Sequence, residues 1–176
     1  MKKYLMGAAA ICCMMISGVA LTACGDDDEP TNPTEDKTPA KVTMKFEYTL
    51  SQDVIDYCDV VVTYNDGTGV KTETMTSTTW SKTVSAKLPA TFSFSKKVTL
   101  KSSKDITQAS SVKVERNYKY VYELLNAEGK TLNSGNYADM GYSMTLAGSG
   151  AAQLINNGRL DDSHTYTFDA NGNLAS

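Results

Sequence analysis

The sequence predicts an all-β fold: an immunoglobulin-like β-sandwich of about seven to nine antiparallel strands with one short helix. Apolar and polar residues alternate along most of residues 42–176, which is the period of a half-buried strand. Turn-forming Asn, Asp and Gly residues separate these runs at a spacing of roughly ten residues. Long helical segments between the runs, which a parallel sheet would need for its crossovers, are not evident.

The first half of this domain is expected to form five strands. Their ranges are residues 42–50, 58–64, 70–77, 80–84 and 92–100. Ser51 is expected to cap one short helical turn after the first strand, and the Asn-Asp-Gly turn at 65–67 indicates a hairpin. Leu88-Pro89-Ala90 is a break at which the chain should change sheet or direction. Lys96 is an outlier on the otherwise apolar face of the fifth strand.

The second half continues the alternation. Strands are expected at residues 112–124, 131–132, 142–146 and 164–168, with a hairpin turn at 127–130. Residues 149–157 are the best helix candidate, because they are rich in Ala and long apolar side chains and Gly158 can end the helix. Tyr118, Tyr120 and Tyr122 share the inward parity of their strand and are expected in the core, although their hydroxyls could edge a groove.

Residues 1–23 have the features of an export signal, namely a basic start, a long apolar stretch and a small-residue end. The run Leu21-Thr22-Ala23-Cys24 resembles the lipobox of bacterial lipoproteins. That resemblance implies cleavage between Ala23 and Cys24 and attachment of a diacylglycerol to the Cys24 sulfur. Two other interpretations remain open: a cleaved signal without lipid, and a retained helix, since about 18 apolar residues can cross a bilayer.

The residues after Cys24 form a compact acidic run, consisting of Asp26, Asp27, Asp28 and Glu29. With Gly25 it resembles the export tag that some Gram-negative gut anaerobes place behind the lipidated cysteine, which implies an outer-membrane protein on the cell exterior. A charged segment is also an ordinary extended tether, and a periplasm-facing lipoprotein is the alternative location. Residues 24–41 are expected to be an acidic, Pro-rich and disordered tether, and residues 42–176 the folded domain.

Charge and cysteine content exclude several classes of function. All 20 acidic residues follow Cys24, so the exported chain is acidic and lacks the basic stripe that nucleic acid requires. Cys12 and Cys13 leave with the signal and Cys24 carries the lipid. Cys58 is then alone, and we expect it in the core, without a disulfide, a Cys-based metal cluster or a cofactor.

Catalytic chemistry finds little support in the sequence, and we assign no catalytic residue. His164 is the single histidine, and no nucleophile elbow occurs around a serine. Asp53, Asp56 and Asp59 leave a carboxylate-dependent glycan hydrolase as an alternative. The segment 169–173 has oxygen ligands suited to calcium, but its Asn-Gly pair first indicates a turn.

Trp80 is the candidate ligand-binding residue. On its polar strand an exposed indole could stack against a sugar ring, whereas burial between the sheets is the alternative interpretation. Residues 63–67, 76–84 and 88–94 also resemble, more loosely, uncharacterised surface lipoproteins with the same leader. The sequence thus predicts a non-enzymatic surface lipoprotein that contacts the membrane through Cys24 and binds a glycan or a surface protein.

Overall fold

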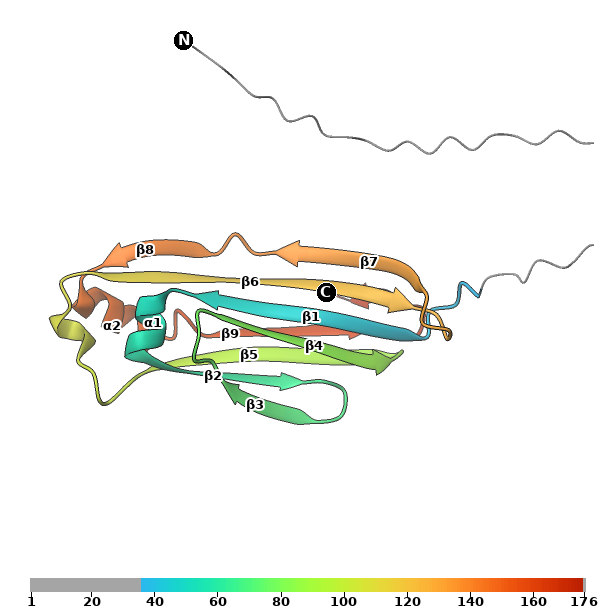
Figure 1. The fold of residues 1–176 in the computed structure, drawn as a ribbon, viewed down its shortest axis with the longest axis horizontal. Coiled ribbons are helices and arrows are strands. Elements are labelled where there is room, and N and C mark those ends of the chain that lie inside the picture. Colours follow the sequence, from blue (N-terminus) through green and yellow to red (C-terminus); the bar gives the residue numbers. More distant parts are fainter. Residues whose placement is uncertain (1–35, 176) are drawn as a thin grey trace, which may run out of the picture. The chain divides into compact units, whose positions relative to one another are not determined.

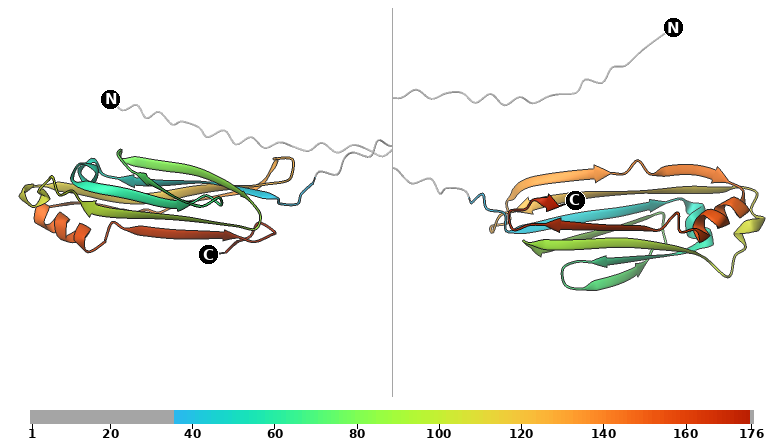
Figure 2. Two further views of the ribbon diagram at one scale, coloured as in Figure 1. Left: turned by 90° about the horizontal axis from the view of Figure 1, so that it is seen from below. Right: turned by 180° about the vertical axis from the view of Figure 1, so that it is seen from behind.

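The computed structural model describes residues 36–175, which form two antiparallel sheets packed face to face (Figures 1 and 2). The all-β sandwich with a short helix is therefore confirmed. The first sheet has the order β4-β1-β6-β7, with β8 also paired to β6, and the second has the order β10-β9-β5-β2-β3. The strands are β1 (Lys41–Leu50), β2 (Cys58–Asn65), β3 (Val70–Thr74), β4 (Thr79–Lys87), β5 (Ala90–Leu100), β6 (Val112–Leu125), β7 (Thr131–Ala138), β8 (Tyr142–Leu146), β9 (Asp162–Phe168) and β10 (Leu174–Ala175).

Three short helices lie at one end of the sandwich (Figures 1 and 2). They are α1 (Gln52–Tyr57), the 3-10 helix η1 (Ile106–Gln108) and α2 (Gly148–Asn156). The helix expected at residues 149–157 is thus present as α2. Among the described residues, no helix has the length and apolar character needed to cross a membrane.

Apolar side chains from both sheets fill the space between them. On β1 every second residue points inward and is at most 1 % exposed, namely Val42, Met44, Phe46, Tyr48 and Leu50. Phe46 stacks on Phe94 of β5 with ring centroids 4.5 Å apart, which joins the two layers at their centre. Cys58 is 2 % exposed, and burial raises the pKa of its thiol to about 11, so it is a core residue.

Ser51 differs from its expected role. It precedes α1, but its side chain makes no capping hydrogen bond to the helix. Instead its hydroxyl donates to the Lys113 carbonyl at 2.6 Å and accepts from the Glu115 N–H at 3.3 Å. Asp53 adds a third link, since its Oδ2 accepts from the Lys113 N–H at 2.6 Å. These bonds fasten α1 to β6 rather than starting the helix.

Two strands differ from the sequence expectation for a physical reason. β7 extends to Ala138, well beyond the expected residues 131–132, because an edge strand can be held by its backbone ladder to β6 without an apolar pattern. β10 was not expected at all, since it pairs with β9 only at Leu174 and Ala175. The Leu88-Pro89 peptide bond is cis and lies between β4 and β5, where the chain passes from one sheet to the other as expected.

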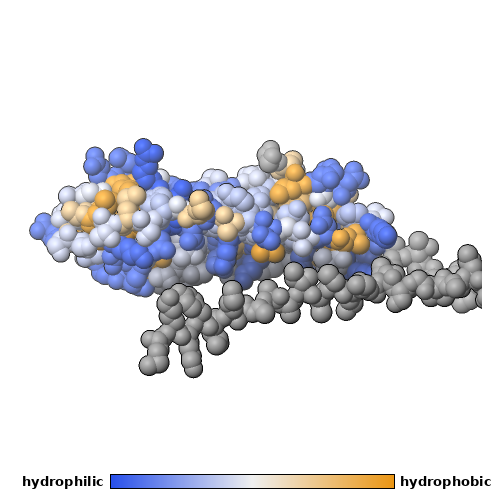
Figure 3. Space-filling view, turned by 90° about the horizontal axis from the view of Figure 1, so that it is seen from above, coloured by the Kyte–Doolittle hydropathy of each residue, from blue (hydrophilic) through white to orange (hydrophobic). Residues whose placement is uncertain are grey.

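The two sheets end unevenly on one side. β6 of the first sheet is followed by β7 along nearly its whole second half, whereas β9 of the second sheet is followed, within residues 36–175, only by the two residues of β10. The inner face of β6 and β7 therefore extends past the cover that the second sheet provides. Figure 3 views the β7–β8 side, where apolar residues form small separate patches among hydrophilic ones rather than one continuous surface.

Candidate functional site

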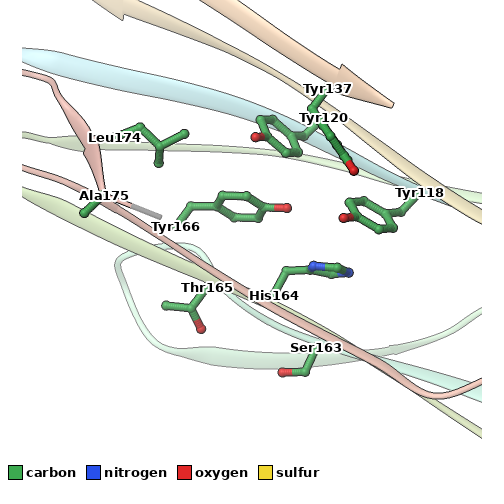
Figure 4. A pocket seen from close by; sticks show the side chains of 9 residues that line it. All are labelled: Tyr118, Tyr120, Tyr137, Ser163, His164, Thr165, Tyr166, Leu174 and Ala175. Carbon is green, nitrogen blue, oxygen red and sulfur yellow. The ribbon is translucent and has the colours of Figure 1, made fainter. Parts of the chain in front are cut away.

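A cavity of about 330 Å³ opens where the second sheet stops short of the first (Figure 4). We call it the tyrosine pocket. Its lining residues are Tyr118, Tyr120, Tyr137, Ser163, His164, Thr165, Tyr166, Leu174 and Ala175. They come from β6, β7, β9 and β10, so the pocket belongs to the uneven side of the sandwich. Its volume is in the range of sites that bind small ligands or side chains.

The tyrosines line this pocket because of their strand positions. Tyr118 and Tyr120 have the inward parity of β6 and pair with Tyr48 and Phe46 of β1. Those β1 side chains are fully buried, but Tyr118 and Tyr120 are only half-buried because they lie nearer the open side. The expectation of a core position is therefore met only in part: Tyr118, Tyr120 and Tyr122 pack against the core half-buried, and the first two line the pocket.

The aromatic rings support one another in a connected wall. Tyr120 lies 4.6 Å from Tyr166 between ring centroids, and Tyr118 lies 4.0 Å from His164. Tyr137 of β7 contacts both β6 tyrosines, at 5.7 Å from Tyr118 and 5.6 Å from Tyr120. Burial and the hydrogen bond with Tyr137 raise the pKa of Tyr118 to about 12. The phenol of Tyr118 is therefore a neutral hydrogen-bonding group at physiological pH.

The backbone of β9 forms the opposite side of the pocket. The side chains of Ser163 and Thr165 point away from the tyrosines, whereas those of His164 and Tyr166 point toward them (Figure 4). This alternation follows from the period of two in a strand. Ser163 and Thr165 therefore contribute main-chain atoms rather than hydroxyls to the pocket.

A partly buried ionic cluster lies beside the pocket, centred on Asp162. The Arg116 Nη1 donates to Asp162 Oδ2 at 2.9 Å, and His164 Nε2 lies 2.8 Å from Asp162 Oδ1. The His164 contact is an ion-pair approach without hydrogen-bond alignment. Lys96 pairs with Asp162 in the β5–β9 ladder, yet its Nζ has no hydrogen-bond partner and its side chain is 2 % exposed.

Protonation in this cluster follows from burial and charge. Burial lowers the pKa of Lys96 to about 8, and the nearby charge of Asp162 opposes that effect only in part. Burial also acts to raise the pKa of Asp162, but the contacts with His164 and Arg116 outweigh it, so the pKa is lowered. The sequence offered one signal for this cluster, the break that Lys96 makes in the apolar face of its strand. Its partners, from β6 and β9, were not foreseen.

His164 lacks the partners of a hydrolytic base. Asp162 would orient the imidazole as in a catalytic triad, but the Ser163 side chain lies on the other face of β9 (Figure 4). Within residues 36–175, no serine, threonine or cysteine side chain hydrogen-bonds to His164. The arrangement is an Asp–His pair with no nucleophile beside it.

Trp80 does not present a surface for a sugar ring. Its side chain is packed between the sheets, and the residue is 7 % exposed. The indole N–H donates to Glu73 Oε2 at 2.8 Å, and Glu73 also accepts from the Tyr64 hydroxyl at 2.7 Å. The interpretation of Trp80 as an exposed stacking residue is thus replaced by the core alternative, because its inward parity on β4 directs it against Tyr48 and Tyr64.

The three carboxylates at residues 53, 56 and 59 do not form one site. Asp53 is bound to the β6 backbone, whereas Asp56 and Asp59 line a second opening of about 340 Å³ below α1. Both of these residues are exposed, and Asp56 accepts a hydrogen bond from Gln52 Nε2 at 2.9 Å. A glycosidase acid needs a carboxyl whose pKa is raised by an apolar site, and an exposed carboxylate lacks that environment.

Residues 169–173 form a turn that is held by hydrogen bonds to the side chain of its own Asp169. Asp169 Oδ1 accepts from the backbone N–H groups of Asn171 and Asn173, both at 2.8 Å, and Gly172 has φ 80°. The Asn173 Nδ2 also donates to Asp169 Oδ2 at 2.8 Å, so the carboxylate closes its own turn, as the Asn-Gly pair indicates. In residues 36–175, no group of three His, Cys, Asp or Glu side chains is placed to hold a metal ion.

The lipidation and export residues lie outside the described residues. They are Ala23, Cys24, Asp26, Asp27, Asp28 and Glu29. Comparison with known proteins finds no matching family model, no matching curated protein and no matching solved structure.

Proposed function

We propose that this chain is a lipid-anchored protein of the outer membrane that faces the cell exterior and acts as a non-enzymatic binding module. The tyrosine pocket is its binding site. The observation that carries the proposal is the uneven side of the sandwich, where half-buried tyrosines of β6 and β7 meet a strand edge of β9.

The composition of the pocket supports binding. Tyrosine offers a large rigid apolar surface and one hydrogen-bonding group, and few of its rotamers are lost when a ligand is bound. Tyr137 is 45 % exposed although it is a large aromatic residue. The contacts of its ring with Tyr118 and Tyr120 hold it in place before any ligand arrives, which lowers the entropic cost of binding.

A binding role is also favoured over catalysis by the chemistry of the site. His164 has an orienting carboxylate in Asp162 but no nucleophile on the same face of β9. The alternative hydrolase would rely on Asp56 and Asp59, which are exposed. We expect no turnover of glycans or peptides, and the variant Asp56→Asn with Asp59→Asn should leave any background hydrolysis unchanged.

The anchor and its location rest on the N-terminal sequence. The lipobox-like run that ends at Cys24 implies the lipid, and the acidic run Asp26 to Glu29 implies the exterior face. Protease treatment of intact cells tests the location, since an external domain is digested while the membrane stays sealed. A variant with the four acidic residues replaced by Asn and Gln should become protected. Glu35→Gln with Asp36→Asn removes charge from the same tether and should remain sensitive.

The binding role is tested by titration of the full chain with soluble oligosaccharides and with short extended peptides. Binding in the pocket should weaken at least tenfold in Tyr137→Ala. The matched control is Val121→Ala, because Val121 is 46 % exposed and lies on the outer face of β6. If neither class of probe binds, or if both variants bind as well as the original chain, the pocket is not the binding site.

A further inference from the structure

We propose that the ligand of the tyrosine pocket is an extended peptide segment of another protein, which pairs antiparallel with the free edge of β9. This inference rests on the proposed binding function and adds the chemical class of the ligand. The segment would extend the second sheet by one strand, and its alternate side chains, apolar or aromatic and without charge, would enter the pocket.

The backbone of β9 presents the hydrogen-bonding groups that such a segment needs. The Asp169 N–H donates to the Asn173 carbonyl at 3.0 Å, on the side of β10. Because backbone groups alternate in direction along a strand, those of Thr167, Thr165 and Ser163 point to that same side. Within the described chain, β10 pairs with β9 at Thr167 and Phe168 and reaches no further.

Thr165 is the centre of this free edge. Its N–H and C=O both point away from β5, so one residue of an added strand can exchange two hydrogen bonds with it. Ser163 offers its C=O, whereas its N–H already donates to Asp162 Oδ1 at 3.1 Å. The added strand would thus pair fully at Thr165 and partly at Ser163.

The register places side chains of the added strand in the pocket. One residue of the added strand would lie opposite Thr165. Its two neighbours in that strand would lie opposite His164 and Tyr166, whose side chains face the tyrosines (Figure 4). β10 provides an internal precedent, because Leu174 pairs with Phe168 on this edge and its side chain lines the pocket. An incoming strand would continue the interaction that Leu174 begins.

The packing of the rings favours a peptide over a sugar. A pyranose needs the open face of an aromatic ring. Tyr118 is stacked on Phe46 with ring planes 5° apart and also contacts His164. Tyr120 lies between Tyr137 and Tyr166. The faces of these two rings are therefore occupied, whereas the β9 main chain is open.

The test uses a short acetylated and amidated peptide that alternates threonine with valine, titrated into the full chain and followed by amide NMR. We expect its binding to perturb the Thr165 amide and to weaken at least tenfold when the alternate amides that face β9 are N-methylated. The N-methylated peptide keeps every side chain but cannot form the ladder, so this comparison needs no variant of the protein.

Two variants extend the test. Thr165→Pro removes the outward N–H at a position where an edge strand tolerates proline, and it should weaken binding at least tenfold. Val121→Ala is the control, because Val121 is exposed on the outer face of β6 and lines no part of the tyrosine pocket, and it should bind as the original does. Thermal unfolding shows whether each variant folds.

The outcomes separate this inference from the proposed function. Equal binding of the plain and N-methylated peptides would overturn strand addition but leave the pocket as a binding site. If oligosaccharides bind and peptides do not, and if Tyr137→Ala weakens the oligosaccharide binding, strand addition is likewise overturned and the pocket remains a binding site. Binding of neither class would overturn both proposals.

Discussion

The Nζ of Lys96 lies 4.9 Å from the centre of the Tyr48 ring, and both residues are almost completely buried. The ring face offers the ammonium group some electrostatic compensation, but no hydrogen-bond partner accompanies it. A buried charge without hydrogen bonds is costly. Lys96 therefore lowers the stability of the fold at neutral pH.

Lys96→Met should stabilise the protein at pH 7 by about 1–3 kcal/mol, because a hydrophobic side chain of similar length removes the desolvation cost. Chemical denaturation measures the change in the free energy of unfolding. Lys45→Met is the matched control, since Lys45 is an exposed lysine on β1, and it should change stability by less than about 0.5 kcal/mol. A Lys96→Met variant that is less stable than this control would contradict the conclusion that the buried charge of Lys96 destabilises the fold.

The same lysine should make stability depend on pH in the alkaline range. Its pKa is about 8 in the folded state, below the ordinary lysine value of 10.5, so the unfolded chain binds more protons between these limits. Stability therefore rises with pH across that window, by at most about 3 kcal/mol. Burial also raises the pKa of Tyr166 and of the Cys58 thiol, and both groups act in the opposite sense above about pH 9, so unfolding should be measured from pH 7.5 to 9. Lys96→Met should lack the rise.

Asp162→Asn should destabilise the protein by about 3 kcal/mol at pH 7, because the partly buried guanidinium of Arg116 and the buried amine of Lys96 lose their counter-charge. The lowered pKa of Asp162 means that its contribution is present above its unfolded pKa of about 3.9 and disappears as the pH falls through the folded value. The difference from the original chain should therefore shrink in acid. Asp56→Asn, at an exposed carboxylate, should be nearly neutral at both pH values.

Trp80 is the only tryptophan, so intrinsic fluorescence reports its environment alone. Acrylamide should quench the folded protein several-fold less than the urea-unfolded chain, because the indole is packed against Tyr48 and Tyr64. Soluble oligosaccharides should leave the emission unchanged. Ready quenching of the folded protein, or an emission shift on adding a sugar, would restore the exposed stacking interpretation.

Cys24→Ala should release the protein from the membrane, since the proposed lipid on Cys24 is its attachment. Fractionation of cells into membrane and soluble parts, with the protein mass recorded, measures the loss of both lipid and attachment. Cys58→Ala replaces the other cysteine that follows the proposed signal, and this variant should remain lipidated and membrane-bound. Retention of the Cys24→Ala variant in the membrane would favour the uncleaved helix.

The alternation of apolar residues predicted most of the fold because burial on one face of a strand leaves a visible mark. β1 shows this from Val42 to Leu50, and β6 shows it from Val112 to Leu124. β7 and β10 left no such mark, since edge strands depend on backbone pairing rather than on buried side chains. A sequence pattern also does not reveal which strand stays unpaired along one edge.

The candidate site was predicted only in fragments for the same reason. The parity of Tyr118 and Tyr120 predicts the core, with a groove edge as the alternative for their hydroxyls, and Tyr137 lies on the part of β7 that the sequence pattern does not reveal. The ionic cluster joins Lys96, Arg116 and Asp162 from three strands whose order requires the fold. The prediction of Trp80 as a ligand-binding residue is wrong because an aromatic residue among polar neighbours can face either the solvent or the core, and Trp80 faces the core.

Hydrogen exchange at single amides of the free protein tests the central claim, that β9 has an open edge at the tyrosine pocket. An open edge predicts that the Thr165 amide exchanges much faster than those of His164 and Tyr166, which point toward β5 in the β5–β9 ladder. Addition of the alternating threonine–valine peptide should then slow the Thr165 amide selectively. Protection of Thr165 in the free protein equal to that of its neighbours would mean that the edge is already covered, and would contradict strand addition at β9.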